Sequence, residues 1–455
     1  MAPTFHTLVD KITCDLPWLR SALQQTGSMD VICGRLLNIC SDVYGEGGKD
    51  VSQEIRFHLM RNDFMLDSSR KEGFRMKQIE LNTVAASFAA HAGDLTEIHR
   101  YVLTKHLQRI DPKLVPSVLA PVLKGALPVS SNAEGLAAAM AEAHHAYVGR
   151  WKSSRTRAVL FVAGTSENNE LDHRKLEGML FRRHGIVSLR RSLEQLAAQA
   201  GELLVPLEGA SDRRAQPKAL VVDGYEVSVA YFRSGYWPGH FDPLEPCWEV
   251  RKLMEFSEAV KCPSAPAQLA GMKKVQQLLC SPENLRRFLE PAQAAEVSRT
   301  FALMSECTGD TEEARRAVEG AKTSPGDWVL KPQTEGSGEL FFGSDIPHVL
   351  TSRKPEELAE FVLMERVWPP VTPSAVFRAE EGSRAQVVVR ASLAELGIYG
   401  VFVADGPRLL QNKAIGHLLR SKARDTNQGG VFVGNAVVDA PLLLPPEVFW
   451  PAVSA

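Results

Sequence analysis

The stretch Trp328-Val329-Leu330-Lys331-Pro332-Gln333-Thr334-Glu335-Gly336-Ser337-Gly338 is an apolar strand that delivers a lysine to a glycine-containing turn. Glycines let backbone N–H groups approach phosphate oxygens closely, and Lys331 supplies a compact positive charge beside them. Glu335 could hold a magnesium ion next to the phosphate. A surface hairpin with solvated side chains is the alternative. The spacing fits neither of the common glycine-rich nucleotide motifs, so neither of their folds is implied.

A second apolar strand turns polar at its end, in Phe361-Val362-Leu363-Met364-Glu365-Arg366-Val367. Such a segment can offer backbone N–H and C=O groups to the edge of an adenine while apolar side chains cover the ring. An ordinary core strand gives the same pattern, because apolar runs of this length are common. Taken alone, the segment therefore leaves both interpretations open.

The segment Lys77-Gln78-Ile79-Glu80-Leu81-Asn82-Thr83 alternates polar and apolar residues, as a strand with one polar face does. The alternation predicts that Gln78, Glu80 and Asn82 point the same way. A carboxylate and an amide oxygen are hard ligands suited to Mg²⁺, which takes few protein ligands together with waters and phosphates. The polar outer face of an edge strand is the alternative.

Basic residues stand out in three further segments. In Gly416-His417-Leu418-Leu419-Arg420-Ser421-Lys422, Arg420 and Lys422 share one face if the chain is extended. Arginine can clamp a carboxylate with two hydrogen bonds and lysine can meet a phosphate, although an exposed basic segment fits equally well. Arg233 follows an apolar strand, and Lys273 opens a helix, where free N–H groups favour anions.

Composition excludes several classes of partner. The 455 residues include 52 Lys and Arg against 54 Asp and Glu, a formal net charge of −2, so we expect no binding to nucleic acid or to an anionic membrane surface. Seven cysteines without paired spacing indicate reduced thiols. With neither a signal-like apolar segment nor a run long enough to span a bilayer, the sequence predicts a cytoplasmic protein.

Hydrophobic periodicity divides the chain into regions of different character. Spacing is mostly helical up to about residue 110, and residues 155–272 alternate strands and helices, which predicts a smaller α/β domain with a partly parallel sheet. A helical block at 273–322 precedes strands that include 385–392 and 397–403, which indicates an α+β region. The fold class expected is thus α/β and α+β, followed by a proline-rich tail.

Together these segments resemble the eukaryotic glutathione synthetases, which belong to the ATP-grasp superfamily. The resemblance spans about residues 50–440 in one order and rests on Lys77–Thr83, Tyr231–Tyr236, Gln268–Gln277, Leu330–Gln333, Glu395–Val401 and Gly416–Arg420. It implies an ATP-grasp core with a flexible lid and a smaller α/β substrate-binding domain. The implied division is 1–154 for the N-terminal helical part and the first part of the core, 155–272 for the substrate domain, 273–440 for the remaining core and lid, and 441–455 for the tail.

The resemblance also implies an ATP-dependent ligase that forms glutathione from γ-glutamylcysteine and glycine through an acyl phosphate, with ATP and Mg²⁺ as cofactors. It implies as catalytic residues Arg61, Lys331 and Arg420, and as magnesium ligands Glu80, Asn82 and Glu335. By the same resemblance, ATP would contact Lys273, Lys331, Gly336, Ser337, Phe342, Met364, Glu365, Glu395 and Lys422. The peptide substrates would contact Arg61, Ser87, Asn169, His173, Arg233, Tyr236, Arg420, Val431 and Phe432.

The chain departs from the usual residues of that family at several sites. Ser337 replaces a glycine and Glu339-Leu340 replaces an asparagine pair in the lid loop, while Phe342 stands for a tyrosine, Ala85 for a serine and His173 for a glutamine. Each change alters one polar contact, worth about 0.5–1.5 kcal/mol, so the departures predict lower affinity rather than lost chemistry.

Phe432-Val433 stand where the family usually has two alanines over the glycine pocket. The larger side chains predict an altered preference among glycine, β-alanine and serine, so a related tripeptide synthetase is one alternative. An ATP-binding pseudoenzyme or regulatory subunit is another, and against it stand the retained residues Glu80, Asn82, Lys331, Glu335 and Lys422. The family is homodimeric, so a homodimer is expected, although the N-terminal region that helps to build the dimer is shorter here.

Overall fold

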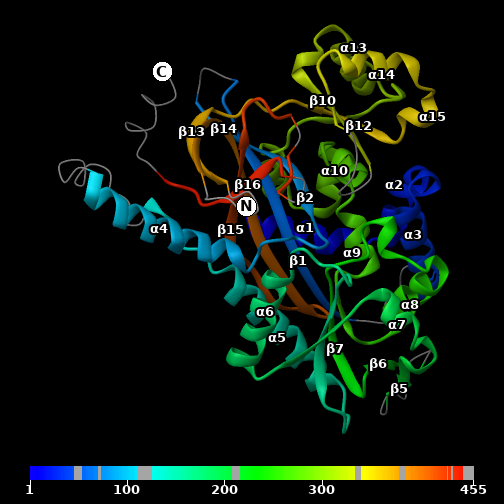
Figure 1. The fold of residues 1–455 in the computed structure, drawn as a ribbon. Helices are drawn as coiled ribbons and strands as arrows, with labels where there is room; N and C mark the ends of the chain where they lie inside the picture. The colour runs from blue at the N-terminus through cyan, green and yellow to red at the C-terminus, as the bar shows by residue number, and fades with distance from the viewer. Residues whose placement is uncertain are drawn as a thin grey trace.

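The computed structural model describes residues 1–45, 54–69, 73–110, 126–207, 216–333, 340–378, 386–427, 429–431 and 434–443. Within these ranges three β-sheets are surrounded by helices (Figure 1). One six-stranded sheet runs through the centre, a second six-stranded sheet lies at the bottom of the view and a four-stranded sheet lies at the top. No helix in the described ranges combines the length and the apolar character that crossing a bilayer requires.

The central sheet has the order β16-β15-β14-β1-β2 with β13 also paired to β14, and all its pairs are antiparallel. β1 lies in a region whose spacing predicted helix, and that prediction is wrong. Because β1 is buried on both faces, its sequence lacks the alternation of a half-exposed strand. β14 is one strand where two were predicted. The strands are β1 (Ile55–Asp67), β2 (Arg75–Asn82), β13 (Thr372–Arg378), β14 (Gln386–Asp405), β15 (Arg408–Ala423) and β16 (Ala436–Asp439).

Helices cover both faces of the central sheet. Since successive side chains of β1 alternate, Met60 and Phe64 join one apolar core with α1, whereas Phe57 and Leu59 join another with α5. Phe5 of α1 meets the ring of Phe64 edge to face. Figure 1 shows α4 extending away from the body beside α5. The helices are α1 (Ala2–Thr13), α2 (Leu16–Met29), α3 (Val31–Tyr44), α4 (His91–Ile110) and α5 (Asn132–Arg150).

The second sheet has the order β4-β3-β7-β6-β5, with β8 beside β7. β3 pairs in parallel with β4 and β7, and β7 with β8, whereas the pairs of β6 are antiparallel, so the predicted partly parallel sheet is confirmed. The region comprises β3 (Arg157–Val162), α6 (Glu170–His184), β4 (Val187–Arg191), α7 (Leu193–Ala197), η3 (Ala200–Glu202), β5 (Leu204–Pro206), β6 (Lys218–Val222), β7 (Tyr225–Phe232), η4 (Pro238–His240), α8 (Leu244–Phe256) and β8 (Val260–Cys262).

The third sheet has the order β11-β10-β12-β9 and is antiparallel. Its own apolar cluster joins Leu330 and Leu363 of the sheet to Ile346 of α14, which confirms the α+β character expected for this part of the chain. The elements from here on are α9 (Ala265–Ala270), α10 (Lys273–Leu279), α11 (Pro282–Phe288), α12 (Pro291–Ser298), β9 (Met304–Glu306), α13 (Glu312–Thr323), η5 (Pro325–Asp327), β10 (Trp328–Pro332), β11 (Phe341–Phe342), α14 (Asp345–Ser352), α15 (Pro355–Leu358) and β12 (Phe361–Glu365).

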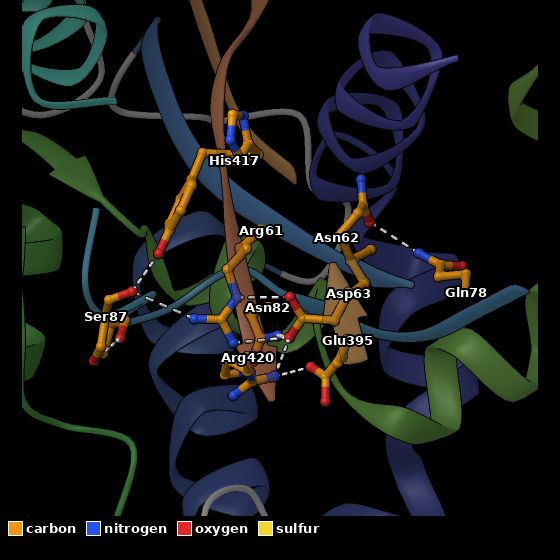
Figure 2. Close-up of polar contacts among 12 residues, drawn as sticks. Arg61, Asn62, Asp63, Gln78, Asn82, Ser87, Glu395, His417 and Arg420 are labelled. Atoms are coloured by element: carbon orange, nitrogen blue, oxygen red, sulfur yellow. Dashed lines mark hydrogen bonds and ion pairs between the residues drawn. The ribbon is translucent and has the colours of Figure 1, made fainter. Parts of the chain in front are cut away.

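A bulge in the pairing of β1 with β2 changes the predicted polar face of β2. The register shifts between Asp63 and Phe64, so the side chains of Gln78 and Asn82 contact opposite faces of β1. Gln78 Nε2 donates to Asn62 Oδ1 at 2.8 Å, whereas Asn82 Nδ2 donates to Asp63 Oδ2 at 2.9 Å (Figure 2). The prediction that Gln78 shares a face with Asn82 is therefore wrong, because a bulge breaks the two-residue period.

Candidate functional site

A cavity of about 910 Å³ lies where β1, β2 and β15 meet the loops of the second sheet. A volume of this order suits small-molecule ligands. Its wall includes residues 81–88, 164–168, 192–194, 236–240 and 429–431. Six of the site residues expected from the sequence line it, namely Arg61, Asn82, Ser87, Tyr236, Arg420 and Val431.

Two arginines in the wall of this cavity are held by one carboxylate, that of Asp63 (Figure 2). Oδ1 of Asp63 accepts from Arg61 Nε at 2.7 Å, and Oδ2 accepts from Arg61 Nη2 at 2.8 Å and from Arg420 Nη2 at 2.9 Å. Arg420 also forms an ion pair with Glu395 of β14. Residues that are hundreds of positions apart in the chain thus form one charged cluster.

Glu80 lies on β2 directly across from Asp63. Burial raises the pKa of the Glu80 carboxyl, but the charges of Lys273 and Lys331, with those of Arg420 and Arg61, together hold that pKa below its ordinary value. For Glu395 the balance is opposite, because burial outweighs Arg420 and raises the pKa of its carboxyl. Glu80 is therefore the carboxylate of this group whose ionised form the site favours, as a cation ligand must be.

Two lysines approach Glu80 from different elements. Lys331 lies on β10, and its Nζ donates to the carbonyl oxygen of Ile79 at 3.3 Å, which connects the third sheet to β2. Lys273 is the first residue of α10, as its sequence predicted, and is buried. The border between the central and third sheets therefore carries concentrated positive charge.

Arg233 is a buried cation whose polar contacts are all with neutral atoms. Its Nε donates to His173 Nε2 at 2.8 Å, Nη1 to Ala86 O at 3.0 Å and to Tyr231 Oη at 3.2 Å, and Nη2 to Ser87 Oγ at 3.0 Å. Within the described ranges, no carboxylate comes within ion-pair distance of this guanidinium. A buried charge without a counter-ion is costly, so the position favours binding of an anion.

His173 and Asn169 are not among the residues that line the cavity. Burial, with Arg233 and Arg190, lowers the pKa of His173 to about 2, so its imidazole is neutral and accepts from Arg233. Asn169 donates to Asp172 Oδ2 at 3.3 Å. Both side chains are buried and contact buried neighbours, and their contact with the peptide substrates stays a prediction.

Phe342, Met364 and Glu365 belong to the third sheet. Phe342 and Met364 pair with Val329 from either side, and Glu365 is exposed at the end of β12. The backbone N–H groups of Glu365 and Arg366 already donate to backbone carbonyl oxygens, each at 2.8 Å. An adenine bound at this segment would therefore have to form its hydrogen bonds with other backbone atoms than these two N–H groups.

Lys422 lies apart from the main cavity. Its Nζ donates to Asn427 O at 2.7 Å, and it lines a smaller cavity of about 120 Å³ beside β14 and β16. Burial outweighs the charge of Glu395 and lowers the pKa of Lys422. Within the described ranges, no three His, Cys, Asp or Glu side chains are grouped to hold a metal ion. Four predicted residues lie outside those ranges, namely Glu335, Gly336, Ser337 and Phe432.

Residues 1–443 match the protein family described as eukaryotic glutathione synthase, ATP binding domain. The chain belongs to the eukaryotic glutathione synthase family. Its three sheets, one of them partly parallel, agree with the α/β and α+β fold class expected from the sequence.

Curated relatives agree with the family match. Glutathione synthetase from Bos taurus is 37% identical over 442 residues, which cover 96% of this chain and 84% of the relative, and that from Homo sapiens is 36% identical over the same shares. Chloroplastic glutathione synthetase from Solanum lycopersicum is 34% identical over 97% of this chain and 73% of its own length. A solved apo structure of a glutathione synthetase-like effector from Globodera pallida has a TM-score of 0.70 over 97% of this chain and 85% of that one, at 17% identity, which shows likeness of fold alone.

Two carboxylates of this glutathione synthase family member were not expected from the sequence. Asp63 holds the two arginines, and the available signal was its position two residues after Arg61 in a segment rich in large apolar residues. Asp172 accepts from the N–H groups of Ala90 and His91 at 2.8 and 2.9 Å, where α4 begins. Since Asp172 lies within an ordinary helical pattern, its sequence gave no signal.

Proposed function

We propose that this chain is an ATP-dependent ligase that forms glutathione from γ-glutamylcysteine and glycine through an acyl phosphate, releasing ADP and phosphate. The observation that carries the proposal is a convergence of cations around one cavity and the sheet border beside it: Arg61 and Arg420 from the central sheet, Arg233 from the second and Lys331 from the third. A triphosphate and a carboxylate repel each other in a poorly solvated site, and such cations offset that repulsion.

The proposed reaction has two steps. A carboxylate oxygen of the dipeptide forms a bond to the γ-phosphorus of ATP while the bond from that phosphorus to the bridging oxygen breaks, so that ADP leaves. The glycine amine then attacks the acyl carbon and phosphate departs. Arg61, Arg420 and Arg233 would bind the carboxylates of the dipeptide, and Lys273 and Lys331 would neutralise the phosphates, so positioning and charge supply most of the rate enhancement.

We propose Mg²⁺ as the metal, held by Glu80 and Asn82 together with Glu335. The residues fit such an ion, because Glu80 favours its ionised form and the amide nitrogen of Asn82 already donates to Asp63, which leaves the amide oxygen for a cation. When bound, the ion would offset the charge of the triphosphate. On the same resemblance we propose a substrate-binding domain at residues 155–272 and a core with its lid at residues 273–440.

A cytoplasmic location and a homodimer complete the proposal. All seven cysteines are free thiols, which supports a reducing compartment. Light scattering during size-exclusion chromatography would measure the mass in solution. A mass of about twice the 50.0 kDa of one chain supports the homodimer, and a mass of one chain rejects it.

The test of the proposed reaction is phosphate release from ATP by the purified protein with Mg²⁺, γ-glutamylcysteine and glycine, together with a mass spectrum of the products. Turnover is expected to require both peptide substrates, and the product is expected to have the mass of glutathione. ATP hydrolysis that does not depend on the peptide substrates, or binding of ATP without turnover, would reject the ligase in favour of a nucleotide-binding protein.

The larger Phe432 and Val433 predict a changed acceptor preference. A pocket usually discriminates by about 10- to 200-fold against one extra methylene. With the altered pocket we expect weaker discrimination, so that kcat/KM for β-alanine or serine lies within about 10-fold of that for glycine. Steady-state rates with each acceptor measure this, and the variant carrying Phe432→Ala and Val433→Ala is expected to restore preference for glycine. Discrimination of more than about 100-fold by the unaltered protein would reject the prediction.

A further inference from the structure

We infer that Asp63 is a positioning residue of the ligase site, which sets the two arginines and the amide of Asn82 without touching substrate. Asp63 lies on β1, between β2 and β14 in the central sheet, and its side chain is fully buried. Its partners Arg61, Asn82 and Arg420 line the cavity, whereas Asp63 itself does not. The inference rests on the proposed function, since it assigns these three side chains to substrate and metal.

The carboxylate of Asp63 accepts four hydrogen bonds, and each fixes a different degree of freedom. Arg61 donates through Nε and Nη2, a two-bond geometry that sets the plane of its guanidinium. Arg420 donates through Nη2 from β15. Asn82 donates through Nδ2, which decides which end of its amide presents an oxygen. One carboxylate thus orients groups from three strands.

Electrostatics gives Asp63 a second role, because it holds two like charges near each other. Burial and the charge of Arg61 lower the pKa of Arg420, but Glu395 and Asp63 outweigh them and raise it. Without the carboxylate, the two guanidinium groups would repel each other in a buried site. Asp63 therefore lets the cavity present two arginines to one anionic substrate.

The neighbouring strand leaves space for this arrangement. Gly397 of β14 pairs with Asp63 in register, and a Cβ at Gly397 would lie 2.8 Å from Asp63 Oδ1 and 2.9 Å from Arg61 Cδ. Both distances are too short for real contacts, so an alanine there would push on the pair. Gly397 offers a way to displace the Asp63–Arg61 pair while every charge is kept.

The principal test compares wild type with Asp63→Asn. An asparagine keeps the shape but turns one acceptor into a donor, which faces donors of Arg61 or Arg420. The KM for γ-glutamylcysteine and the half-saturating concentration of Mg²⁺ are each expected to rise roughly 10- to 100-fold, as loss of charged hydrogen bonds implies, while the KM for ATP stays within about two-fold. Steady-state kinetics with each substrate varied in turn measures all three.

The matched control is Asp10→Asn, which alters a buried carboxylate of α1 that binds β1 from its other face. Asp10 accepts from Arg56 Nε at 2.7 Å and from Arg56 Nη2 at 3.1 Å, and neither residue lines the cavity. This variant is expected to lower Tm and to leave every KM unchanged. If Asp63→Asn behaves in the same way, with a lower Tm but an unchanged KM for the dipeptide, the positioning role is overturned.

Gly397→Ala keeps the inference testable if Asp63→Asn does not fold. Because this variant retains all charges, it is expected to raise the KM for the dipeptide roughly 10-fold, and an unchanged KM contradicts the inference. Turnover of the wild type tests the proposed function independently of the role of Asp63. Absence of glutathione from wild type refutes the proposed function, whereas normal wild-type turnover with unaffected variants refutes the role of Asp63 alone.

Discussion

Replacing Lys331 by alanine is expected to abolish measurable phosphate release from ATP, a fall of at least roughly 1,000-fold, because the lysine would stabilise charge that moves during phosphoryl transfer. The side chain reaches from β10 to Ile79 O of β2 and helps to keep the Glu80 carboxyl ionised. Its neighbour Leu330, which is fully buried, holds β10 in its own apolar cluster. The fold is therefore expected to survive, with Tm close to that of wild type.

Lys322→Ala is the matched control for Lys331→Ala, because Lys322 is an exposed lysine in the last turn of α13 in the same region. It is expected to keep wild-type rates. Lys331→Arg retains charge but lacks the compact ammonium group, so it is expected to recover a small part of the activity. Turnover of Lys331→Ala above about one-tenth of wild type would remove the lysine from its proposed role.

Short motifs predicted those parts of the site that one strand or one helix end determines. Lys331 was expected at the end of an apolar strand and Lys273 at a helix start, and both occupy those positions. The alternation of strands and helices in residues 155–272 also gave the partly parallel second sheet. In these cases the physical signal is local, since it depends on periodicity or on a terminus.

The remaining features depend on pairing between distant segments. β1 is covered by α1 on one face and by α5 on the other, so no alternation marks it. Asp63 was missed together with this strand, although its partners Arg61, Asn82 and Arg420 were expected at the site. The bulge that turns Gln78 away from Asn82 has no signature in the residues of β2 alone. The hydrogen bond between Arg233 and His173 also joins separate elements, the segment after β7 and α6, so the residues of neither segment alone could predict it.

Replacing Arg233 by methionine is expected to raise the KM for γ-glutamylcysteine about 100-fold with a smaller change in kcat, which steady-state kinetics would measure. In the described part of the chain, its guanidinium has neutral acceptors but no carboxylate partner, so we expect a substrate anion to supply the missing charge. In the substrate-free protein, burial of this charge without a counter-ion lowers the free energy of unfolding. The free energy of unfolding should consequently fall only by about 1–2 kcal/mol, for the hydrogen bonds lost.

Arg251→Met is the control, for which we expect a large loss of stability and no change in the KM for the dipeptide. Arg251 is also fully buried, but its Nη1 lies 2.6 Å from Glu255 Oε2, so the substitution leaves a buried carboxylate without its cation. Breaking such a pair costs about 3–5 kcal/mol, and the dipeptide KM of whatever protein folds should be unchanged. Thermal or urea unfolding separates the two variants. If Arg233→Met loses as much stability as Arg251→Met and binds the dipeptide normally, Arg233 serves the fold, and the anion that we assign to it must bind elsewhere.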